Sequence, residues 1–253
     1  MIVMLMLQRQ RQLIELLKSN GNFSTTELAQ KLSVSNATIR RDLIELEKNG
    51  QIQRIHGGAV AVTGPTYEIP FSYRNDRNDT AKHNIAAKAA KLIQDGSTLI
   101  LDASSTAARL VPFLAEKTEL TVITNSPRTA LELAACHIRT MMTGGLLLEN
   151  SIAFVGHRAE DFLEGISADY LFISCRGISE DGYLTDSSLE ESDIRRTMLR
   201  CIKKGGKKVL CCDESKRNCG YTYRICRLEE MDVVITEKGV YLPSQFMTEN
   251  KSK

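Results

Sequence analysis

The stretch from Phe23 to Leu46, FSTTELAQKLSVSNATIRRDLIEL, constrains the fold more than any other part of this 253-residue chain. It predicts two short helices joined by a tight turn. The S-x-x-E pattern of Ser24 and Glu27 is a capping box, which opens the first helix. Ser35 stands where it would cap the second helix. Two helices joined by a capped turn are typical of a helix-turn-helix, whose second helix enters the DNA major groove.

The predicted second helix has one apolar face and one small, polar and basic face. Ile39, Leu43 and Leu46 repeat at i, i+4 and i+7, which is the spacing of residues on one side of a helix. The opposite side offers little bulk, groups that hydrogen-bond to base edges, and arginine for guanine or phosphate. The residues of this segment that we predict to contact DNA are Ser35, Asn36, Ala37, Thr38, Arg40 and Arg41.

The flanking segments complete a small domain. Residues 8–19 predict a helix with one apolar stripe, and residues 52–62 predict a β-hairpin that turns at Gly57-Gly58. Such a hairpin would form a wing, with Arg54 and His56 placed to contact phosphate or the minor groove. Residues 1–60 hold eight Lys/Arg against five Asp/Glu, although the whole chain has a net charge of only +2. Together with the capped helix, the turn, the double arginine and the wing in this order, the local charge favours a DNA-binding domain over a helical domain with surface arginines.

The segment ELAQKLSVSNATIRRDLIELEKNG, followed by RIHGGAV, resembles the signature of the DeoR family of bacterial transcription regulators. TIRRDL and HGGA are the most specific parts of this resemblance. It implies a winged helix-turn-helix DNA-binding domain over residues 1–60. Residues 61–80 are then an interdomain linker, because this stretch has two prolines, a glycine and no clear period.

Beyond the linker, helical stretches alternate with short apolar runs. The predicted strands are residues 97–101, 120–124, 138–142, 170–173, 208–212 and 233–235. The predicted helices are residues 85–93, 106–114, 128–135, 160–164 and 194–203. This alternation predicts an α/β domain with a mainly parallel sheet. We assign residues 81–241 to this domain and residues 242–253 to a C-terminal tail.

Polar residues follow several predicted strands at their carboxyl ends, where open α/β sheets bind ligands. Hydroxyls and amides there bind anions, Lys216 adds positive charge, and Asp102 suits sugar hydroxyls. We therefore predict a pocket for a phosphorylated sugar or polyol, although the same residue types also occur in loops for turn formation alone. The predicted site residues from these loops are Asp102, Ser104, Ser105, Thr106, Thr124, Asn125, Gly144, Gly145, Gly156 and Lys216.

The resemblance extends over this second domain. The effector domain of DeoR-family regulators is similar in fold to ribose-5-phosphate isomerase, and its motifs recur here as DASST, TN, GG, FVG, GISEDG, a glutamate and DESK. This implies the same fold and adds Glu191 to the predicted effector site. Ser104 departs from the family glycine and adds a Cβ in the phosphate-type loop, so an unphosphorylated effector is the alternative. Arg195 stands where lysine is common.

Other chemistries fit the sequence less well. The seven cysteines include Cys211-Cys212, but there is no C-x-x-C and no nearby histidine, so we predict no metal or redox site. Asp102, Asp186 and Glu191 are the candidates for the carboxylate base of a sugar-phosphate isomerase, which is the less favoured alternative. The attached DNA-binding domain favours a pocket that senses its ligand without turnover. We therefore predict no catalytic residues and no cofactor.

Together these patterns predict a cytoplasmic transcription regulator, associated with the nucleoid when bound to DNA. It would repress a sugar or polyol operon under the control of a small phosphorylated metabolite. Its predicted partners are double-stranded operator DNA, this effector and further copies of the chain as a dimer or tetramer, since paired operator half-sites require at least two copies. The apolar start MIVMLML is too short for a membrane span and lacks the flanks of a signal peptide.

Overall fold

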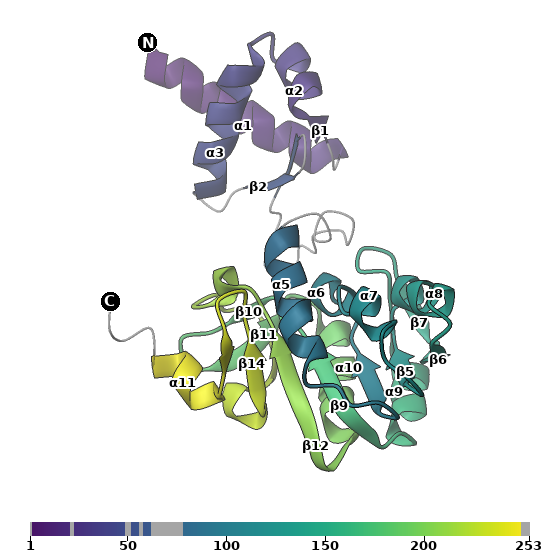
Figure 1. Cartoon of the computed structure of the whole chain (residues 1–253). Coiled ribbons are helices and arrows are strands. Elements are labelled where there is room, and N and C mark those ends of the chain that lie inside the picture. The colour runs from purple at the N-terminus through teal and green to yellow at the C-terminus, as the bar shows by residue number, and fades with distance from the viewer. Residues whose placement is uncertain (1, 21–22, 49–51, 56–57, 62–77, 249–253) are drawn as a thin grey trace. The chain divides into compact units, whose positions relative to one another are not determined.

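The computed structural model describes residues 2–20, 23–48, 52–55, 58–61 and 78–248 of the chain (Figure 1). The chain divides into two compact units, Met1–Tyr67 and Glu68–Lys253. Each unit has its own hydrophobic core, so each is described by itself. Of the linker predicted at residues 61–80, residues 62–77 lie outside the described ranges.

The first unit consists of three helices and a small antiparallel sheet. Its elements are α1 (Ile2–Asn20), β1 (Phe23–Ser24), α2 (Thr25–Lys31), α3 (Asn36–Lys48), β2 (Ile52–Ile55) and β3 (Gly58–Ala61). The predicted capping box is confirmed, because Ser24 accepts from the Glu27 amide while the Glu27 side chain accepts from the Ser24 amide. The predicted apolar face of α3 is also confirmed: Ile39, Leu43 and Leu46 are buried with Leu13 of α1 and Leu28 of α2. Helix α1 begins at Ile2, earlier than the predicted start at residue 8.

The prediction that Gly58 lies in the turn of the hairpin is wrong. Gly58 is the first residue of β3, and it pairs with Ile55 on one side and with Ser24 of β1 on the other. A Cβ at this position would lie 1.9 Å from the carbonyl oxygen of Phe23. Glycine is therefore required by the close approach of a third strand, which the local sequence did not indicate. Gly57 lies outside the described residues.

The second unit is built on a seven-stranded sheet in the order β15-β14-β12-β9-β4-β5-β6. All neighbouring strands are parallel except β14 and β15, so the predicted mainly parallel α/β fold is confirmed. The helices and strands in chain order are α5 (Asp79–Ala90), β4 (Thr98–Leu101), α6 (Ser105–Ala108), α7 (Val111–Leu114), β5 (Thr121–Thr124), α8 (Pro127–Ala135), β6 (Arg139–Met142), β7 (Leu146–Leu148), β8 (Ala153–Val155), α9 (His157–Glu164), β9 (Ala168–Ile173), β10 (Gly177–Ile178), β11 (Tyr183–Asp186), α10 (Leu189–Arg200), β12 (Ile202–Cys211), the 3-10 helix η1 (Glu214–Lys216), β13 (Tyr223–Arg227), the 3-10 helix η2 (Leu228–Glu230), β14 (Val233–Ile235), β15 (Val240–Tyr241) and α11 (Pro243–Thr248).

The strand order contains one reversal. The chain runs outward from β4 through β5 to β6, and then returns to place β9 on the other side of β4. Leu99 and Leu101 of β4 pair in register with Tyr170 and Phe172 of β9. The loops after β4 and β9 therefore lead away from the sheet in different directions. Such a switch point is where open α/β sheets bind their ligands.

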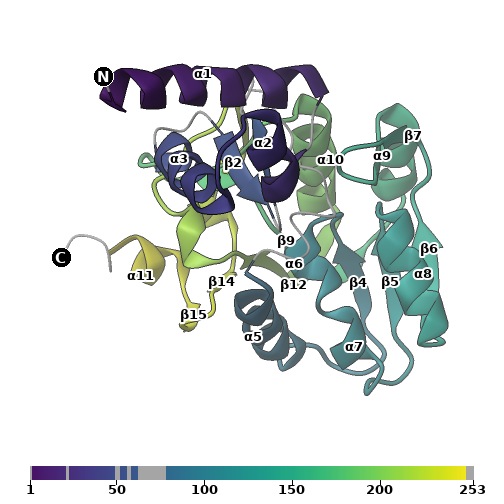
Figure 2. The same ribbon diagram turned by 90° about the horizontal axis from the view of Figure 1, so that it is seen from above.

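Helices cover both faces of this sheet, as a turned view shows (Figure 2). Apolar residues of α5, α7 and α8 form one core with the sheet. Residues of α9, α10 and α11 form the other core, together with a small antiparallel sheet of β10, β11 and β13. Two-sided burial explains why strands such as Leu99–Leu101 are continuous apolar runs without polar alternation.

Several predicted elements have different bounds. The predicted helix 194–203 is wrong at both ends: α10 starts at Leu189, after Ser188 caps it by accepting from the Glu191 amide, and β12 already begins at Ile202. Gly205 has a φ of 84°, and the register of β12 shifts nearby, which bends a lysine-rich strand. The predicted helix 106–114 is two short helices. The stretch predicted as a tail contains α11, whose Phe246 is buried in the core.

Candidate functional site

The outward side of α3 carries most of the residues predicted to contact DNA. Asn36, Ala37, Arg40 and Arg41 are exposed, as is Ser35 just before the helix. Thr38 is half-buried, because its amide donates to the Ser35 hydroxyl at 3.2 Å and the two hydroxyls are 2.9 Å apart. This cap fixes the start of the helix and occupies the Thr38 hydroxyl in the described conformation.

A partly buried ion pair holds α3 against α1. Arg9 donates from Nη2 to Asp42 Oδ1 at 3.0 Å and from Nε to Asp42 Oδ2, and the Asp42 side chain is only 3% exposed. The hydrogen bond to Asp42 raises the pKa of Arg9 despite partial burial. Arg41 and Asp42 are neighbours in sequence and lie about 100° apart around the helix axis. Arg41 is exposed and Asp42 is buried, so the ion pair that holds α3 also keeps Arg41 on its outward side.

The predicted wing is described in part. Arg54 of β2 is exposed, and its backbone amide donates to Glu47 Oε1 at 3.1 Å, which ties the hairpin to the end of α3. His56, the other predicted contact of the wing, lies outside the described residues.

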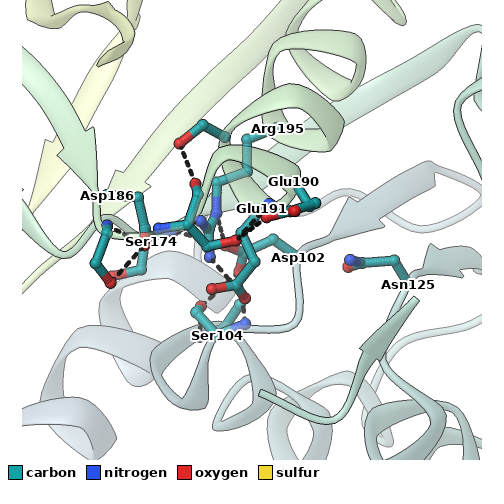
Figure 3. A network of polar contacts seen from close by, with 12 residues as sticks. Asp102, Ser104, Asn125, Ser174, Asp186, Glu190, Glu191 and Arg195 are labelled. Carbon is teal, nitrogen blue, oxygen red and sulfur yellow. Dashed lines mark hydrogen bonds and ion pairs between the residues drawn. The ribbon is translucent and has the colours of Figure 1, made fainter. Parts of the chain in front are cut away.

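The switch point between β4 and β9 is filled by the carboxylate of Asp102, which is 1% exposed (Figure 3). Its Oδ1 accepts hydrogen bonds from the amide of Ser104, at 3.1 Å, and from the Ser104 hydroxyl. Its Oδ2 accepts from the amide of Ser174, after β9, at 3.2 Å, and from Arg195 Nε at 2.9 Å. Four donors therefore occupy the two oxygens and join both loops of the switch point to α10.

Arg195 of α10 connects three carboxylates (Figure 3). Besides Asp102, it donates from Nη1 to Asp186 Oδ2 at 2.8 Å, and its Nη2 lies 3.7 Å from Glu191 Oε1. All four side chains are at most 7% exposed. Burial alone would lower the pKa of Arg195, but Asp186, Glu191 and Asp102 together raise it well above its usual range. We call this group the Arg195 network.

Serine caps link the Arg195 network to two helix starts. Ser104 accepts from the Ala107 amide at 3.1 Å and so caps α6. Ser188 caps α10, while its own amide donates to Asp186 Oδ1 at 3.3 Å. Ser104 has an ordinary extended backbone, with a φ of −76°, so the residue that replaces the family glycine fits without strain. Its hydroxyl occupies an amide that a glycine would leave to other acceptors.

Four of the other predicted residues of the effector site lie just beyond β4 or at the end of β5. Ser105 and Thr106 are buried in α6. Thr124 and Asn125 follow β5, and Asn125 exchanges hydrogen bonds with the backbone of Phe154 at 2.7 and 2.9 Å. Phe154 lies in β8, which pairs with β7, so Asn125 joins the β7–β8 hairpin to the seven-stranded sheet. The Asn125 Oδ1 atom is buried without a partner in the described part of the chain and, being an acceptor, suits a ligand hydroxyl.

The predicted glycines allow close backbone approach near Asn125. Gly145 has a φ of 112°, and a Cβ there would lie 2.6 Å from the carbonyl oxygen of Val155. Gly144 and Gly156 also have positive φ values, and Gly156 occupies the N-cap position of α9. These glycines therefore bring the loop after β6 beside the start of α9.

Lys216 lies in η1, which follows β12. Its charge lowers the pKa of both Asp213 and the buried Cys175 thiol, although burial raises the pKa of Cys175 to about 12 overall. The charges of Asp186, Arg195 and Asp102 also act on Cys175. Lys216 and the three charged residues of the Arg195 network therefore act on one common group, the Cys175 thiol.

Two protein-family models match this chain, one in each unit. A model of the DeoR-like helix-turn-helix domain matches residues 9–64, and a model of the DeoR C terminal sensor domain matches residues 77–238. The chain belongs to the DeoR family of transcriptional regulators.

Full-length relatives agree with this assignment. The chain is 36% identical to the uncharacterized HTH-type transcriptional regulator YulB of Bacillus subtilis, over 94% of this chain and 91% of the relative. It is 36% identical to the HTH-type transcriptional regulator GolR of Listeria innocua, over 92% and 91%. It is 32% identical to the lactose phosphotransferase system repressor of Staphylococcus aureus, over 91% of each. Among solved structures, ribose 5-phosphate isomerase A of Methanocaldococcus jannaschii matches with a TM-score of 0.41 and 20% identity, over 55% of each chain.

Five of the seven cysteines of this DeoR-family chain are buried, and the other two, Cys136 and Cys219, are partly exposed. Cys211 ends β12, Cys212 follows it, and both are fully buried, which raises the pKa of each thiol. Across the described ranges, no group of three or more His, Cys, Asp and Glu side chains is arranged to hold a metal ion. No helix within those ranges is long and apolar enough to cross a membrane.

Two central residues of the network were absent from the predicted effector site. Arg195 was noted only as a substitution for lysine, and Asp186 only as a possible base. The contact between Arg195 and Asp102 has no local signal, because the two residues are 93 positions apart in the chain. The spacing of Glu191 and Arg195, i and i+4 on one helix, was the one detectable sign that they interact. Ser174 contributes a backbone amide, which sequence patterns do not report.

Proposed function

We propose that this DeoR-family regulator is a repressor of a sugar or polyol operon, released or retained on its operator by a small phosphorylated metabolite. The observation that carries the proposal is the Arg195 network at the switch point of the second unit, in a chain whose first unit presents a polar, basic helix face. One unit offers groups for DNA and the other offers a polar site for a small molecule.

The exposed side of α3 supports the DNA-binding part. Arg40 and Arg41 lie one helical turn after small residues such as Ala37. The small residues let the helix approach the groove closely, while the arginines reach guanine or phosphate. We propose that Ser35, Asn36, Ala37, Thr38, Arg40 and Arg41 contact the operator, with Arg54 and His56 on the flanking backbone or minor groove. Paired half-sites then require at least a dimer of this cytoplasmic protein.

The strand-end residues support the effector part. We propose that Asn125, Thr124 and the glycine-rich loops contact the effector, that Lys216 neutralises its phosphate, and that Asp102, Ser104 and Glu191 hold the surrounding loops in place. Ser105 and Thr106 supply hydroxyls from α6. A relative named for a sugar, the lactose phosphotransferase system repressor, favours a carbohydrate-derived effector.

Ser104 favours an unphosphorylated effector as the second candidate. Its hydroxyl already occupies the Ala107 amide and one oxygen of Asp102. The start of α6 is therefore capped by the protein itself, whereas a glycine would leave that amide to a phosphate. In addition, three carboxylates share one guanidinium in the Arg195 network, which suits hydroxyl donors better than a second anion.

An isomerase activity is the weakest candidate. A general base needs a free lone pair within reach of the substrate proton, and four donors already occupy the Asp102 carboxylate. The full-length relatives are named as regulators. We therefore propose that the site binds its ligand without turnover.

The test is thermal-shift screening of the full chain against pentose, hexose and alditol phosphates and their unphosphorylated counterparts. A ligand that binds only the native state at 100-fold above its dissociation constant stabilises it by about 2.7 kcal/mol. Lys216→Gln should weaken binding of a phosphorylated hit by about 10-fold, while the exposed control Lys204→Gln should not. A hit that binds equally well without its phosphate favours the second candidate. Turnover of any hit would refute sensing without catalysis.

A further inference from the structure

The two edge strands of the seven-stranded sheet differ in how far other parts of the chain protect them from pairing with another strand. At one edge, β15 is only two residues long and antiparallel, and α11 follows it with Phe246 buried in the core. A very short edge strand with a helix beside it is a usual protection against pairing with other chains. At the other edge, β6 has four residues, pairs with β5 on one side only, and contains no proline and no lysine. Within the described residues, the β6 edge has no comparable protection.

Large apolar side chains are exposed along this second edge. Met142 at the end of β6 is 44% exposed, and Leu131 on the adjacent helix α8 is 73% exposed. The chain then continues into β7, where Leu146 and Leu147 are 66% and 46% exposed. α8, β6 and β7 lie at the same end of the sheet in both views (Figures 1 and 2). We call these four residues the β6-edge patch. Exposed apolar groups clustered at one edge are typical of a protein interface.

The charges around the β6-edge patch indicate what covers it. Arg139 is exposed at the start of β6, and Glu149 is exposed just after β7. Arg128 and Glu132 on α8 already pair with each other at 3.0 Å. The β6–β7 segment therefore has an exposed cation at its start and an exposed anion just after its end, which disfavours DNA or a strongly charged partner. It is instead complementary to itself after a two-fold rotation.

We propose that the β6-edge patch is the interface between two copies of this chain, with the two β6 strands antiparallel to each other. This arrangement places the Arg139 end of one copy beside the Glu149 end of the other. Leucines 131, 146 and 147 and Met142 from both copies are then buried against each other, and the open edge of the sheet is paired. The proposal rests on the proposed function for the need of at least a dimer, and it names the surface that provides it.

The test is sedimentation velocity of the full chain without DNA or effector, so that the mass is read independently of both ligands. The double variant L146S/L147S and the single variant L131S should weaken self-association by about 100-fold, because they remove apolar contacts at the centre of the interface. The matched control V240S/L242S replaces side chains that are 51% and 55% exposed at the opposite edge, and it should keep the wild-type mass. Circular dichroism confirms that each variant is folded.

A charge exchange keeps the test decisive if a leucine variant does not fold. R139E and E149R should each weaken self-association by about 10-fold, since each places like charges together at both symmetric ends. The double variant R139E/E149R should restore it. A wild-type chain that is monomeric, patch variants with unchanged mass, or a double reversal no better than the single ones would overturn the proposal. If operator binding fails while these masses behave as expected, the proposed function fails and the interface stands.

Discussion

Each unit of the chain contains an arginine paired with buried carboxylate, and the two arrangements differ in the number of carboxylates. In the first unit, one guanidinium meets one carboxylate: Arg9 from α1 pairs with Asp42 of α3. In the second unit, one guanidinium meets three carboxylates, and Asp102, Asp186 and Glu191 come from three different elements around Arg195. The first pair is balanced in charge, and the second has more acid than base.

This difference separates a structural pair from a candidate site. A balanced pair between two helices fixes their relative orientation and leaves no charge unmatched. Three carboxylates around one guanidinium concentrate charge at a topological switch point, and taking charged groups out of water is costly for folding. Unfavourable buried polarity of this kind is usual where a protein binds a ligand. We therefore expect the two arginines to respond differently to substitution.

The largest expected effect is on the stability of the second unit. Arg195→Ala leaves three buried carboxylates without their cation and should lower the free energy of unfolding by about 3–5 kcal/mol. Arg195→Lys keeps the charge but loses the planar fork that spans three partners, so it should restore only part of this stability. Differential scanning calorimetry of the full chain measures both. A loss equal in the two variants would show that geometry, not charge, dominates the network.

A smaller loss is expected in the first unit. Arg9→Ala leaves the buried Asp42 unpaired, but the Arg9 side chain is 22% exposed, so the loss should be about 2–3 kcal/mol. The exposed neighbour Arg11 is the matched control, and Arg11→Ala should leave unfolding unchanged. Chemical denaturation of the full chain with a probe in each unit measures this. If Arg9→Ala lowered the stability of the second unit instead, the assignment of the pair to helix packing in the first unit would be wrong.

Arg41→Ala should affect DNA binding without affecting either unit's stability. Arg41 is exposed on the outward side of α3, so its removal should cost about 1–3 kcal/mol of operator affinity if it reads a base. Fluorescence anisotropy with DNA from the promoter of the chain's own gene measures the affinity, with the exposed Lys91→Ala of the second unit as control. Unchanged operator binding by Arg41→Ala would count against α3 as the recognition helix.

The smallest expected effect is on the acid dependence of stability near Lys216. Burial alone would raise the pKa of Asp213, but hydrogen bonds from Ser215 and the charge of Lys216 hold it below its ordinary value. A carboxyl with a lowered folded-state pKa stabilises the fold above its ordinary value, about pH 4, and this contribution is lost as the pH falls through the folded-state value. Asp213→Asn should therefore reduce the loss of unfolding free energy as the pH falls below about 4, measured by denaturant unfolding at a series of pH values. An unchanged acid limb would contradict the pairing.

Local signals made some elements predictable. The capping serines Ser24 and Ser35 mark helix starts within a few residues, and apolar runs such as Leu99–Leu101 mark buried strands. The parallel α/β class followed from their alternation. Short strands such as β10, β11 and β13 were not predicted, because runs of two to five residues with polar neighbours have no detectable period.

The candidate sites were predictable only where they depend on one segment. The outward face of α3 follows from helical spacing, and the strand-end loops follow from the position of the strands. The Arg195 network could not be predicted in this way. It joins residues from the loop after β4, from β11 and from α10, and their contact depends on the strand order. Likewise, Gly58 is required by a pairing with β1 that lies 34 positions earlier in the chain.

The central claim is that a small molecule bound at the switch point of the second unit controls DNA binding by α3. Fluorescence anisotropy of the full chain on its own promoter DNA, with and without each hit from the thermal-shift panel, tests it most directly. We predict that at least one sugar or polyol metabolite changes operator affinity by about 10-fold or more, which corresponds to a coupling of about 1.4 kcal/mol. We also predict that Asn125→Ala abolishes this change without altering affinity in the absence of the metabolite. Operator affinity that no bound metabolite alters, or a response that survives in Asn125→Ala, would contradict the account.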